Sequence, residues 1–307
     1  MDPASFSRVG DQSAVTAQPQ TPEQRKQAMQ ALISCPTFSI HCRQRQPGEL
    51  RAAQESFPLP VPGCTRVHWT GYAAESSFGA TAYFIRRPEG NILVDVPRWT
   101  PLLAQRLQQL GGVRWIFLTH RDDVGDHQAW AEATGAQRII HRSEANRRQG
   151  TDKCEVQLEG EGPWQLTASG SVQAVPHSSS SGGSNASSHG GDAGTGSSSG
   201  TGTEEDVLLL FTPGHTAGCL SLLYRPDQAL FTGDHLAWSN RLQRLTIFRA
   251  YNWHSVPQQL DSVAALRDLD FVHVLPGHGR RAVLADAADR RRQIDELLAA
   301  EGWRGGA

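Results

Sequence analysis

The sequence predicts an α/β fold in which two β-sheets pack face to face and helices cover their outer faces. The first observation behind this prediction is that short apolar runs alternate with amphipathic stretches in two separate blocks of the chain. The second is that four of these runs end in a small turn followed by His or Asp. We expect a polar N-terminal arm over residues 1–60 and one folded domain over residues 61–307.

The first block begins with three apolar runs separated by Gly or Pro, which predict a meander of strands. These runs are Thr65–Trp69, Thr81–Ile85 and Asn91–Val96. Leucines at helical spacing then predict a helix over Pro101–Leu110, which ends at a pair of glycines. The block continues with a strand at Arg114–Leu118, a helix at Asp126–Thr134 and a strand at Arg138–His141.

The second block repeats this plan, and its apolar runs again predict strands followed by helices. The predicted strands are Val207–Phe211, Leu220–Tyr224, Ala229–Phe231 and Phe271–Leu275. The predicted helices are Gln258–Leu269 and a final helix, rich in Asp, Glu and Arg, over Ala285–Ala300. In the polar arm, only the stretch near Pro22–Leu32 has helical character.

A segment between the blocks, Ser178–Thr203, consists almost wholly of Ser and Gly. It cannot bury apolar area, so we expect a flexible surface loop. Its flanks, Leu166–Val175 and Val207–Phe211, both have the pattern of strands. The segment is therefore predicted to be an insertion at 178–203 within one domain.

The charge of the chain is balanced, with 29 Lys and Arg against 31 Asp and Glu. This balance argues against a general nucleic-acid binder, which needs a basic excess or a basic face. The sequence has neither an apolar run of roughly 20 residues, as a bilayer span requires, nor the apolar core of a secretory signal. We expect a soluble intracellular protein with a small-molecule substrate, in the cytoplasm or, if residues 1–30 include a transit segment, in an organelle such as a plastid. The oligomeric state stays open.

The cysteines predict a reducing compartment, because they are few, odd in number and far apart. They are Cys35, Cys42, Cys64, Cys154 and Cys219. Cys35-Pro36 resembles the end of a ferredoxin cluster motif, C-x2-C-x2-C-x3-C-P. The motif would place its other cysteines where the chain has Arg25, Ala28 and Ala31. We therefore expect that the arm of a single chain does not hold an iron–sulfur cluster.

Four predicted strands share one construction at their ends, where a turn presents a His or an Asp. The segments are Ile116–His120, Leu210–His215, Leu230–His235 and Val274–His278. Strand ends are where a rigid scaffold presents side chains to a cleft. His nitrogens and Asp oxygens are ligands for zinc, iron and manganese. The four ends together predict a metal site.

These motifs resemble those of the metallo-β-lactamase fold superfamily, whose first motif is T-H-x-H-x-D-H. The later motifs match closely at Pro213–Thr216, Thr232–Asp234 and Pro276–Gly279. The first motif departs from the pattern. Asp122 stands where the second His belongs, and the Asp-His pair comes two residues late, at Asp126-His127. The resemblance covers roughly residues 65–280 and implies a four-layer αββα sandwich.

Carried over residue by residue, the resemblance implies two divalent metal ions. The first would bind His120 and His215, with Asp122 as an open candidate. The second would bind Asp126, His127 and His278, and Asp234 would bridge the two ions. For Asp122 and Asp123 the other interpretation is an N-cap of the following helix. The many carboxylates leave zinc, iron and manganese open, and flavodiiron proteins of the same superfamily also carry a carboxylate in the second His position.

The function that this resemblance implies is a metal-dependent hydrolase. Two ions can share a water and lower its pKa toward about 7, which gives a metal-bound hydroxide at neutral pH. The expected substrates are an ester, a thioester or a related bond. Asp122 or Asp126 would orient the nucleophile or accept its proton, and His254 could supply a polar group to the pocket. Two alternatives remain: a diiron oxidoreductase acting on oxygen, nitric oxide or a persulfide, and a non-catalytic member of the fold.

The Ser- and Gly-rich insertion gives the first testable prediction. Deleting Ser178–Thr203 and joining its flanks should leave the melting temperature within a few degrees, because loop-closure entropy changes by only about 0.6 kcal/mol per doubling of loop length. Thermal unfolding of the shortened chain measures this. A collapse in soluble yield together with loss of bound metal would show that the segment is structural.

Overall fold

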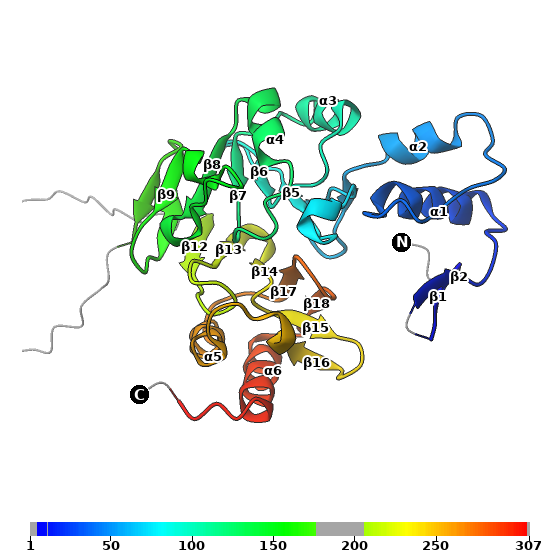
Figure 1. Cartoon of the computed structure of the whole chain (residues 1–307). Helices are drawn as coiled ribbons and strands as arrows, with labels where there is room; N and C mark the ends of the chain where they lie inside the picture. The colour runs from blue at the N-terminus through cyan, green and yellow to red at the C-terminus, as the bar shows by residue number, and fades with distance from the viewer. Residues whose placement is uncertain (1–4, 11, 176–205, 306–307) are drawn as a thin grey trace, which may run out of the picture.

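Two seven-stranded sheets face each other in the structure, a computed structural model that describes residues 5–10, 12–175 and 206–305 (Figure 1). The predicted insertion at 178–203 lies outside these residues. Helices cover the outer face of each sheet, which confirms the predicted αββα sandwich.

The first sheet combines an antiparallel meander with a parallel half. Its strands, in spatial order, are β3 (Leu59–Pro60), β4 (Val67–Trp69), β5 (Tyr83–Ile85), β6 (Ile92–Val94), β7 (Trp115–Phe117), β8 (Gln137–His141) and β9 (Val156–Leu158). Strands β3 to β6 pair antiparallel, as the meander predicts, and β6 to β9 pair parallel.

The second sheet is largely antiparallel, and only β14 and β17 pair in parallel. Its strands, in spatial order, are β11 (Val172–Ala174), β10 (Trp164–Leu166), β12 (Val207–Phe211), β13 (Leu220–Tyr224), β14 (Ala229–Gly233), β17 (His273–Pro276) and β18 (Ala282–Val283). The single strand predicted over Leu166–Val175 is wrong. A turn at Gly170, whose φ is +85°, divides it into two strands that pair with each other.

Alternation along each strand divides the apolar residues between two layers. In β5, Tyr83 and Ile85 face the other sheet, whereas Phe84 faces outward to the layer under the helices. The outer layer of the first sheet packs against α3 (Pro101–Gln109) and α4 (His127–Thr134). That of the second sheet packs against α5 (Val256–Ala265) and α6 (Ala287–Ala300), seen below the sandwich in Figure 1.

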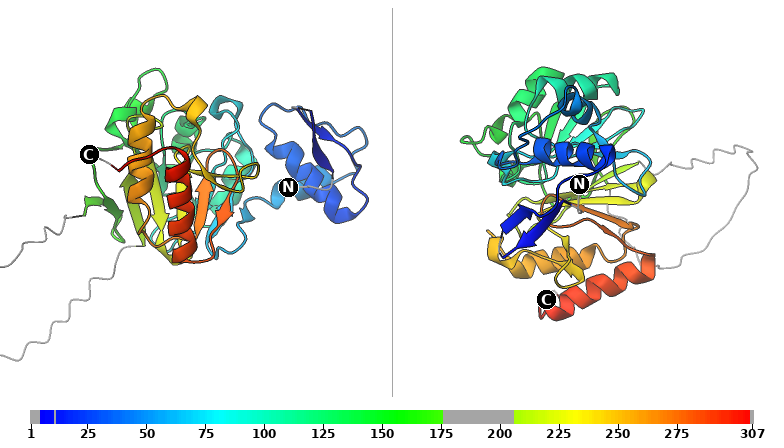
Figure 2. Two further views of the ribbon diagram at one scale, coloured as in Figure 1. Left: turned by 90° about the horizontal axis from the view of Figure 1, so that it is seen from below. Right: turned by 90° about the vertical axis from the view of Figure 1, so that its right-hand side faces the viewer.

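The residues before β3 are more ordered than a polar arm with one helix. They form a hairpin of β1 (Phe6–Val9) and β2 (Gln12–Val15), then α1 (Pro22–Ser34) and α2 (Glu49–Glu55). Thr21 and Gln24 make a reciprocal capping box at the start of α1. We call residues 5–10 and 12–56 the N-terminal module, and Figure 2 shows it beside the sandwich, outside both sheets.

Two further features complete the described fold. A small antiparallel pair, β15 (Ala237–Ser239) and β16 (Arg244–Thr246), follows β14. Among the helices of the described ranges, none combines the length and the apolar character that a membrane crossing needs.

One buried carboxylate ties the two sheets together. Asp227, in the 3-10 turn after β13, accepts hydrogen bonds from the backbone amides of Thr65, Arg66 and Val67, and from the Thr65 hydroxyl. Burial alone would raise the pKa of Asp227, but these hydrogen bonds lower it below its ordinary value. The ionised carboxylate therefore fixes the start of β4 to the second sheet.

Replacing this carboxylate should destabilise the protein in a pH-dependent way. Asp227→Asn should lower the free energy of unfolding at pH 7 by about 1.5–3 kcal/mol, the usual range for hydrogen bonds to a charged group. Since the folded pKa is lowered, the contribution is full above the unfolded pKa of about 3.9 and is lost as the pH falls through the folded pKa. Urea unfolding at several pH values should show the two proteins converging in acid. A constant difference would contradict this role.

The core between the sheets gives a second stability prediction. Phe231 is fully buried, and its ring packs edge-on to that of Tyr83 at a centroid distance of 5.3 Å. Phe231→Ala should cost about 3–5 kcal/mol, because the sheets cannot close over the lost ring. Tyr83→Phe is the control, since it removes only the hydrogen bond from the Tyr83 hydroxyl to the Pro276 carbonyl and should cost about 1 kcal/mol. Equal losses in the two variants would show that packing of the Phe231 ring stabilises the fold no more than this single hydrogen bond does.

Candidate metal centre

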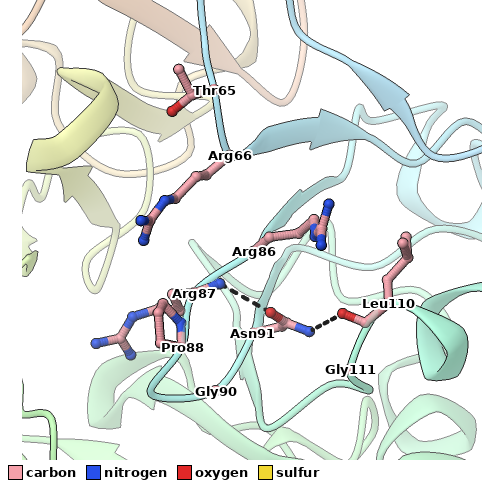
Figure 3. Close-up of a pocket in the computed structure, with 9 residues that line it drawn as sticks. All are labelled: Thr65, Arg66, Arg86, Arg87, Pro88, Gly90, Asn91, Leu110 and Gly111. Atoms are coloured by element: carbon pink, nitrogen blue, oxygen red, sulfur yellow. Dashed lines mark hydrogen bonds between the residues drawn. The ribbon is translucent and has the colours of Figure 1, made fainter.

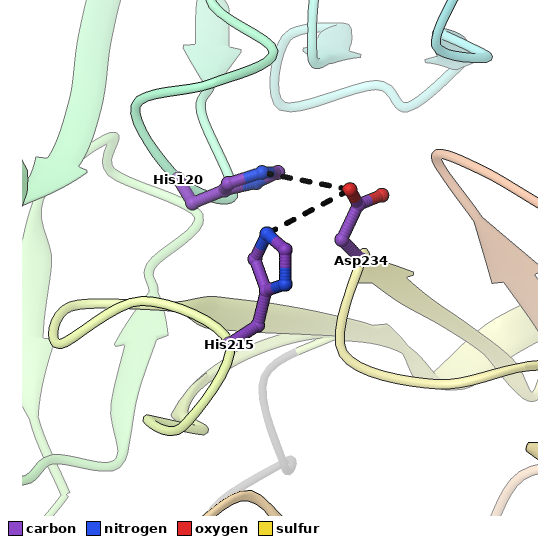
Figure 4. Close-up of side chains that lie close together, drawn as sticks. All are labelled: His120, His215 and Asp234. Carbon is purple, nitrogen blue, oxygen red and sulfur yellow. Dashed lines mark ion pairs between the residues drawn. The ribbon is translucent and has the colours of Figure 1, made fainter. Parts of the chain in front are cut away.

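Strand ends from both sheets meet at one edge of the sandwich. His120 follows β7 of the first sheet, whereas His215, Asp234 and His278 follow β12, β14 and β17 of the second. Figure 4 shows His120 and His215 pointing toward Asp234. The common construction of these four segments therefore places their side chains together.

The ligand atoms form two groups that share one carboxylate. In the first group, Asp234 Oδ2 lies 3.9 Å from His120 Nε2 and 3.7 Å from His215 Nε2. The second group consists of Asp123, Asp234 and His278, with His278 Nε2 3.4 Å from Asp123 Oδ1. In each group the potential ligand atoms lie within 4.8 Å of one another. Asp234 thus belongs to both groups.

Asp122 lies at the rim of the first group. Its Oδ2 is 3.8 Å from His215 Nε2, and its side chain is 26% exposed. Burial raises the pKa of Asp122 above its ordinary value. Asp122 therefore lies beside the ligand cluster and also lines the cavity next to it.

Buried polar atoms without partners show that the cluster fits a cation. Within the described residues, none of the following atoms has a hydrogen-bond partner: His120 Nε2, Asp122 Oδ2, both carboxylate oxygens of Asp123, His215 Nε2 and Asp234 Oδ1. Leaving such atoms unsatisfied costs free energy, most of all for carboxylates. The mixture of imidazole and carboxylate donors suits zinc, iron or manganese.

Burial and the neighbouring charges shift the pKa values of the residues in the cluster. Burial and the neighbouring Asp123 raise the pKa of Asp234 to about 6. Burial and the nearby His120 lower the pKa of His215 to about 3. Burial would lower the pKa of His278 as well, but its ion pair with Asp123, at 3.4 Å, raises it to about 9. The cluster thus concentrates negative charge that a divalent ion would neutralise.

The structure does not bring Asp126 and His127 to this cluster. Asp126 precedes α4, and its Oδ2 accepts a hydrogen bond from the backbone amide of Trp99 at 2.7 Å. His127 Nε2 lies 2.9 Å from the carbonyl oxygen of Gln149. The pair makes these contacts and belongs to neither donor group, whereas Asp123 is a member of the second group.

The turn after β7 explains this exchange of residues. Val124 is buried in the apolar layer beneath the helices, and α4 begins only three residues later, at His127. Asp123 therefore stays in the turn beside β7, whereas Asp126 and His127 occupy the start of the helix. The adjacent pair Asp122-Asp123, directly after His120 and Arg121, is the sequence signal that could have identified Asp123.

The other expected catalytic residue, His254, lies outside the cluster. Its side chain is exposed, and its backbone amide donates to the side chain of Asn252. The cavity is lined instead by its neighbours Tyr251 and Trp253.

Buried polar residues hold the ligands from behind. The Thr119 hydroxyl lies 2.9 Å from His120 Nδ1, and the Thr119 backbone amide donates to Asp95. Burial and the charge of Asp123 raise the pKa of Asp95 to about 7. Gly233 must lack a side chain, because its φ is +49° and a Cβ there would lie 2.5 Å from the Thr119 hydroxyl. Asp95 is not among the site residues predicted from the sequence, although it too follows an apolar run.

Glu144 joins two of the ligand-bearing turns. It is fully buried and accepts hydrogen bonds from the backbone amides of Arg121 and Gly218, at 3.1 Å and 2.6 Å. It thereby fixes the turn after β7 to the turn that carries His215. Nothing in the local sequence signals this role, because the partners are distant along the chain.

A cavity of about 740 Å³ opens above the cluster. Its lining residues are Phe78, Arg121, Asp122, His215, Asp234, Phe248, Tyr251, Trp253 and His278. Three of its aromatic residues are unusually exposed: Phe78 at 77%, Tyr251 at 64% and Trp253 at 63%. Exposed apolar residues gathered around one cavity are typical of a ligand site.

A second cavity, of about 510 Å³, is lined by residues next to the start of β4, the end of β5 and the start of β6 (Figure 3). Asn91, which precedes β6, accepts from the Arg87 amide and donates to the Leu110 carbonyl there. Arg87 is already paired with Asp206 at 2.6 Å. Among the described residues that line this cavity there is no His, Cys, Asp or Glu.

Comparison with known families identifies two regions of the chain. The family model of the metallo-beta-lactamase superfamily matches residues 77–279. Comparison with curated protein sequences gives no significant match.

Among solved structures, the chain is similar to the DIM-1 metallo-beta-lactamase, with 13% identity, a TM-score of 0.50 and coverage of 78% of this chain and 96% of that one. It is also similar to VMB-1, with 12% identity, a TM-score of 0.50 and coverage of 79% and 97%. These similarities concern the fold.

The second family model, for the 4Fe-4S single cluster domain of ferredoxin I, matches residues 1–42. A 4Fe-4S cluster of this type is held by four Cys thiolates, but residues 1–42 contain only Cys35 and Cys42. The Cys35 thiol is already within hydrogen-bond distance of the Thr37 and Ser39 hydroxyls. The donor set of this segment does not fit the cluster.

Two matched variants test which carboxylate of the first motif binds metal. Asp123→Asn should lose metal from the second group, because it removes a charge that His278 and Asp234 face. Asp126→Asn should keep its metal, because within the described residues its carboxylate accepts a hydrogen bond from the Trp99 amide and lies outside both donor groups. Metal content after dialysis, measured by elemental analysis, decides. Loss of metal from Asp126→Asn with a full complement in Asp123→Asn would contradict the assignment.

Proposed function

Because this chain belongs to the metallo-beta-lactamase superfamily, we propose that it is a metal-dependent hydrolase with a two-metal centre. The observation that carries the proposal is the pair of donor groups that share Asp234 beneath a cavity. The cavity volume is in the range of small-molecule sites, so the proposed substrate is a small molecule with an ester, thioester or related bond.

The proposed ligands follow from the two groups. His120, His215 and Asp234 would hold one ion, and Asp123, Asp234 and His278 the other. Divalent ions bound here would supply Lewis acidity and a water of lowered pKa. We propose zinc or iron as the metal, with manganese as a further candidate.

Other residues of the chain would position the ligands, accept a proton and exclude water. Thr119 and Asp95 hold His120 in position through the hydroxyl contact at Nδ1. Asp122 has an unpartnered Oδ2 at the cavity and a raised pKa, so it is the group we propose to accept and hold a proton beside the reacting bond. The exposed aromatic residues of the cavity, Phe78, Tyr251 and Trp253, would exclude water from the substrate.

A second candidate function has one observation in its favour. The Asp123, Asp234 and His278 group offers two carboxylates and one imidazole, a donor set that iron accepts well. This favours a diiron oxidoreductase acting on oxygen, nitric oxide or a persulfide. Elemental analysis of the isolated protein, with hydrolysis assays on esters and thioesters beside oxygen-uptake assays, separates the two functions.

The shared carboxylate gives the sharpest test of the two-metal centre. Asp234→Ala should lose more metal than either His120→Ala or His278→Ala, because it alone belongs to both groups. Metal content and hydrolysis rates should fall together in this variant. Full metal occupancy with full activity would exclude the two-metal centre.

Asp122→Ala separates a ligand from a proton acceptor. If Asp122 only accepts a proton, metal content should stay unchanged while the hydrolysis rate falls by about 10²–10⁴-fold. If it binds metal, the content should fall as well. An unchanged rate with unchanged metal would show that Asp122 has neither role.

A further inference from the structure

The N-terminal module contacts one loop that reaches the cavity. This loop, residues 70–79, is the first part of the connection from β4 to β5, and we call it the lip loop. Phe78 lines the cavity at one end of the lip loop. Its φ is +50°, a conformation that a bulky residue adopts only where its surroundings hold it.

Close packing joins the base of the lip loop to the segment after α2. Gly71, with a φ of +66°, lies so close to Phe57 that a Cβ would sit 2.4 Å from its ring. The Phe57 and Tyr72 rings pack edge-on at 5.4 Å. Met29 and Ile33 of α1 belong to the same buried cluster. The start of the lip loop is therefore packed against the cluster that includes α1.

Arg98 connects the module to the middle of the lip loop. Its guanidinium donates to the carbonyl of Ile33, at the end of α1, and to that of Ala73 in the loop. It also lies 4.3 Å from the centre of the Phe38 ring, a cation–π distance. Phe38 is 56% exposed, so its ring is kept there by this contact more than by burial.

A last contact lies directly beside Phe78. Gly79 has a φ of +82°, and a Cβ there would lie 3.1 Å from Pro36 Cγ. Pro36 therefore packs against the backbone next to the cavity residue. Contacts with the module and its connection to β3 thus reach the base, the middle and the end of the lip loop.

We propose that the N-terminal module, which lacks the ligands of the cluster its family model implies, positions Phe78 and so selects substrates with an aromatic or bulky apolar group. This inference rests on the proposed use of the cavity as the substrate site. Arg121 lines the cavity too, but its Nε lies 3.6 Å from the buried Glu144, so its charge is already paired. The edge of the cavity therefore favours a substrate with an apolar group over one with an anionic group.

The test uses 4-phenylbutan-1-ol, a neutral probe that needs no metal, and four variants of the full chain. Arg98→Met removes the guanidinium that joins the Ile33 and Ala73 carbonyls, and Phe38→Ala removes the ring that lies against this guanidinium. Phe78→Ala removes the rim contact itself. Val15→Ala, at an exposed position in the hairpin, is the matched control. Probe affinity is measured by titration, and hydrogen exchange of residues 70–79 reports on the lip loop.

We expect Phe78→Ala, Arg98→Met and Phe38→Ala each to bind the probe about 3- to 10-fold more weakly, the range for losing one aromatic contact. Arg98→Met and Phe38→Ala should also speed exchange in residues 70–79, and Val15→Ala should change neither quantity. If Arg98→Met does not fold, Phe38→Ala decides, because its side chain is largely exposed. Unchanged probe affinity in Phe78→Ala would overturn the proposal. So would unchanged probe affinity together with unchanged hydrogen exchange in both Arg98→Met and Phe38→Ala. A metal-free or inactive wild-type protein would instead refute the proposed function, because the probe is neutral and is not hydrolysed.

Discussion

The burial of several carboxylates at one point is the constraint on which the site depends. Asp95 and Asp123 are almost fully buried, and Asp234 nearly so. Removing such charges from water without a compensating partner costs several kcal/mol per ion. Backbone amides and the Thr119 hydroxyl compensate Asp95, but the oxygens of Asp123 have no hydrogen-bond partner among the described residues. The imbalance makes a cation the natural complement of this edge of the sandwich.

Local patterns in the sequence are sufficient to predict the layers of the fold. Apolar runs with strand or helix periodicity predict the inner strands of both sheets and α3 to α6, because each element buries one face against its neighbours. They do not predict the short edge strands β3, β9 and β18. The pattern does not reveal that Leu166–Val175 turns at Gly170. It also misses the order in the N-terminal module, where few apolar residues are needed because α1 packs against the domain.

The sequence predicts those residues of the candidate site that directly follow a predicted strand. His120, His215, Asp234 and His278 follow strand ends, so the sheet topology and the face-to-face packing of the two sheets together bring them to one place. The choice among Asp122, Asp123 and Asp126 depends instead on where α4 begins and how Val124 is buried. Such details come from packing between distant segments, as the Glu144 hydrogen bonds to two separate turns show.

The donors of the first group come from different sheets, and this has a thermodynamic consequence. An ion that binds His120 and His215 together can do so only when both halves of the sandwich are assembled. A ligand that binds only the folded chain stabilises it by RT ln(1 + [L]/Kd), about 4.1 kcal/mol at a free concentration of 1,000 Kd. The fraction of molecules that stay folded, and so escape proteolysis, would then follow the supply of the ion in the compartment where the chain resides.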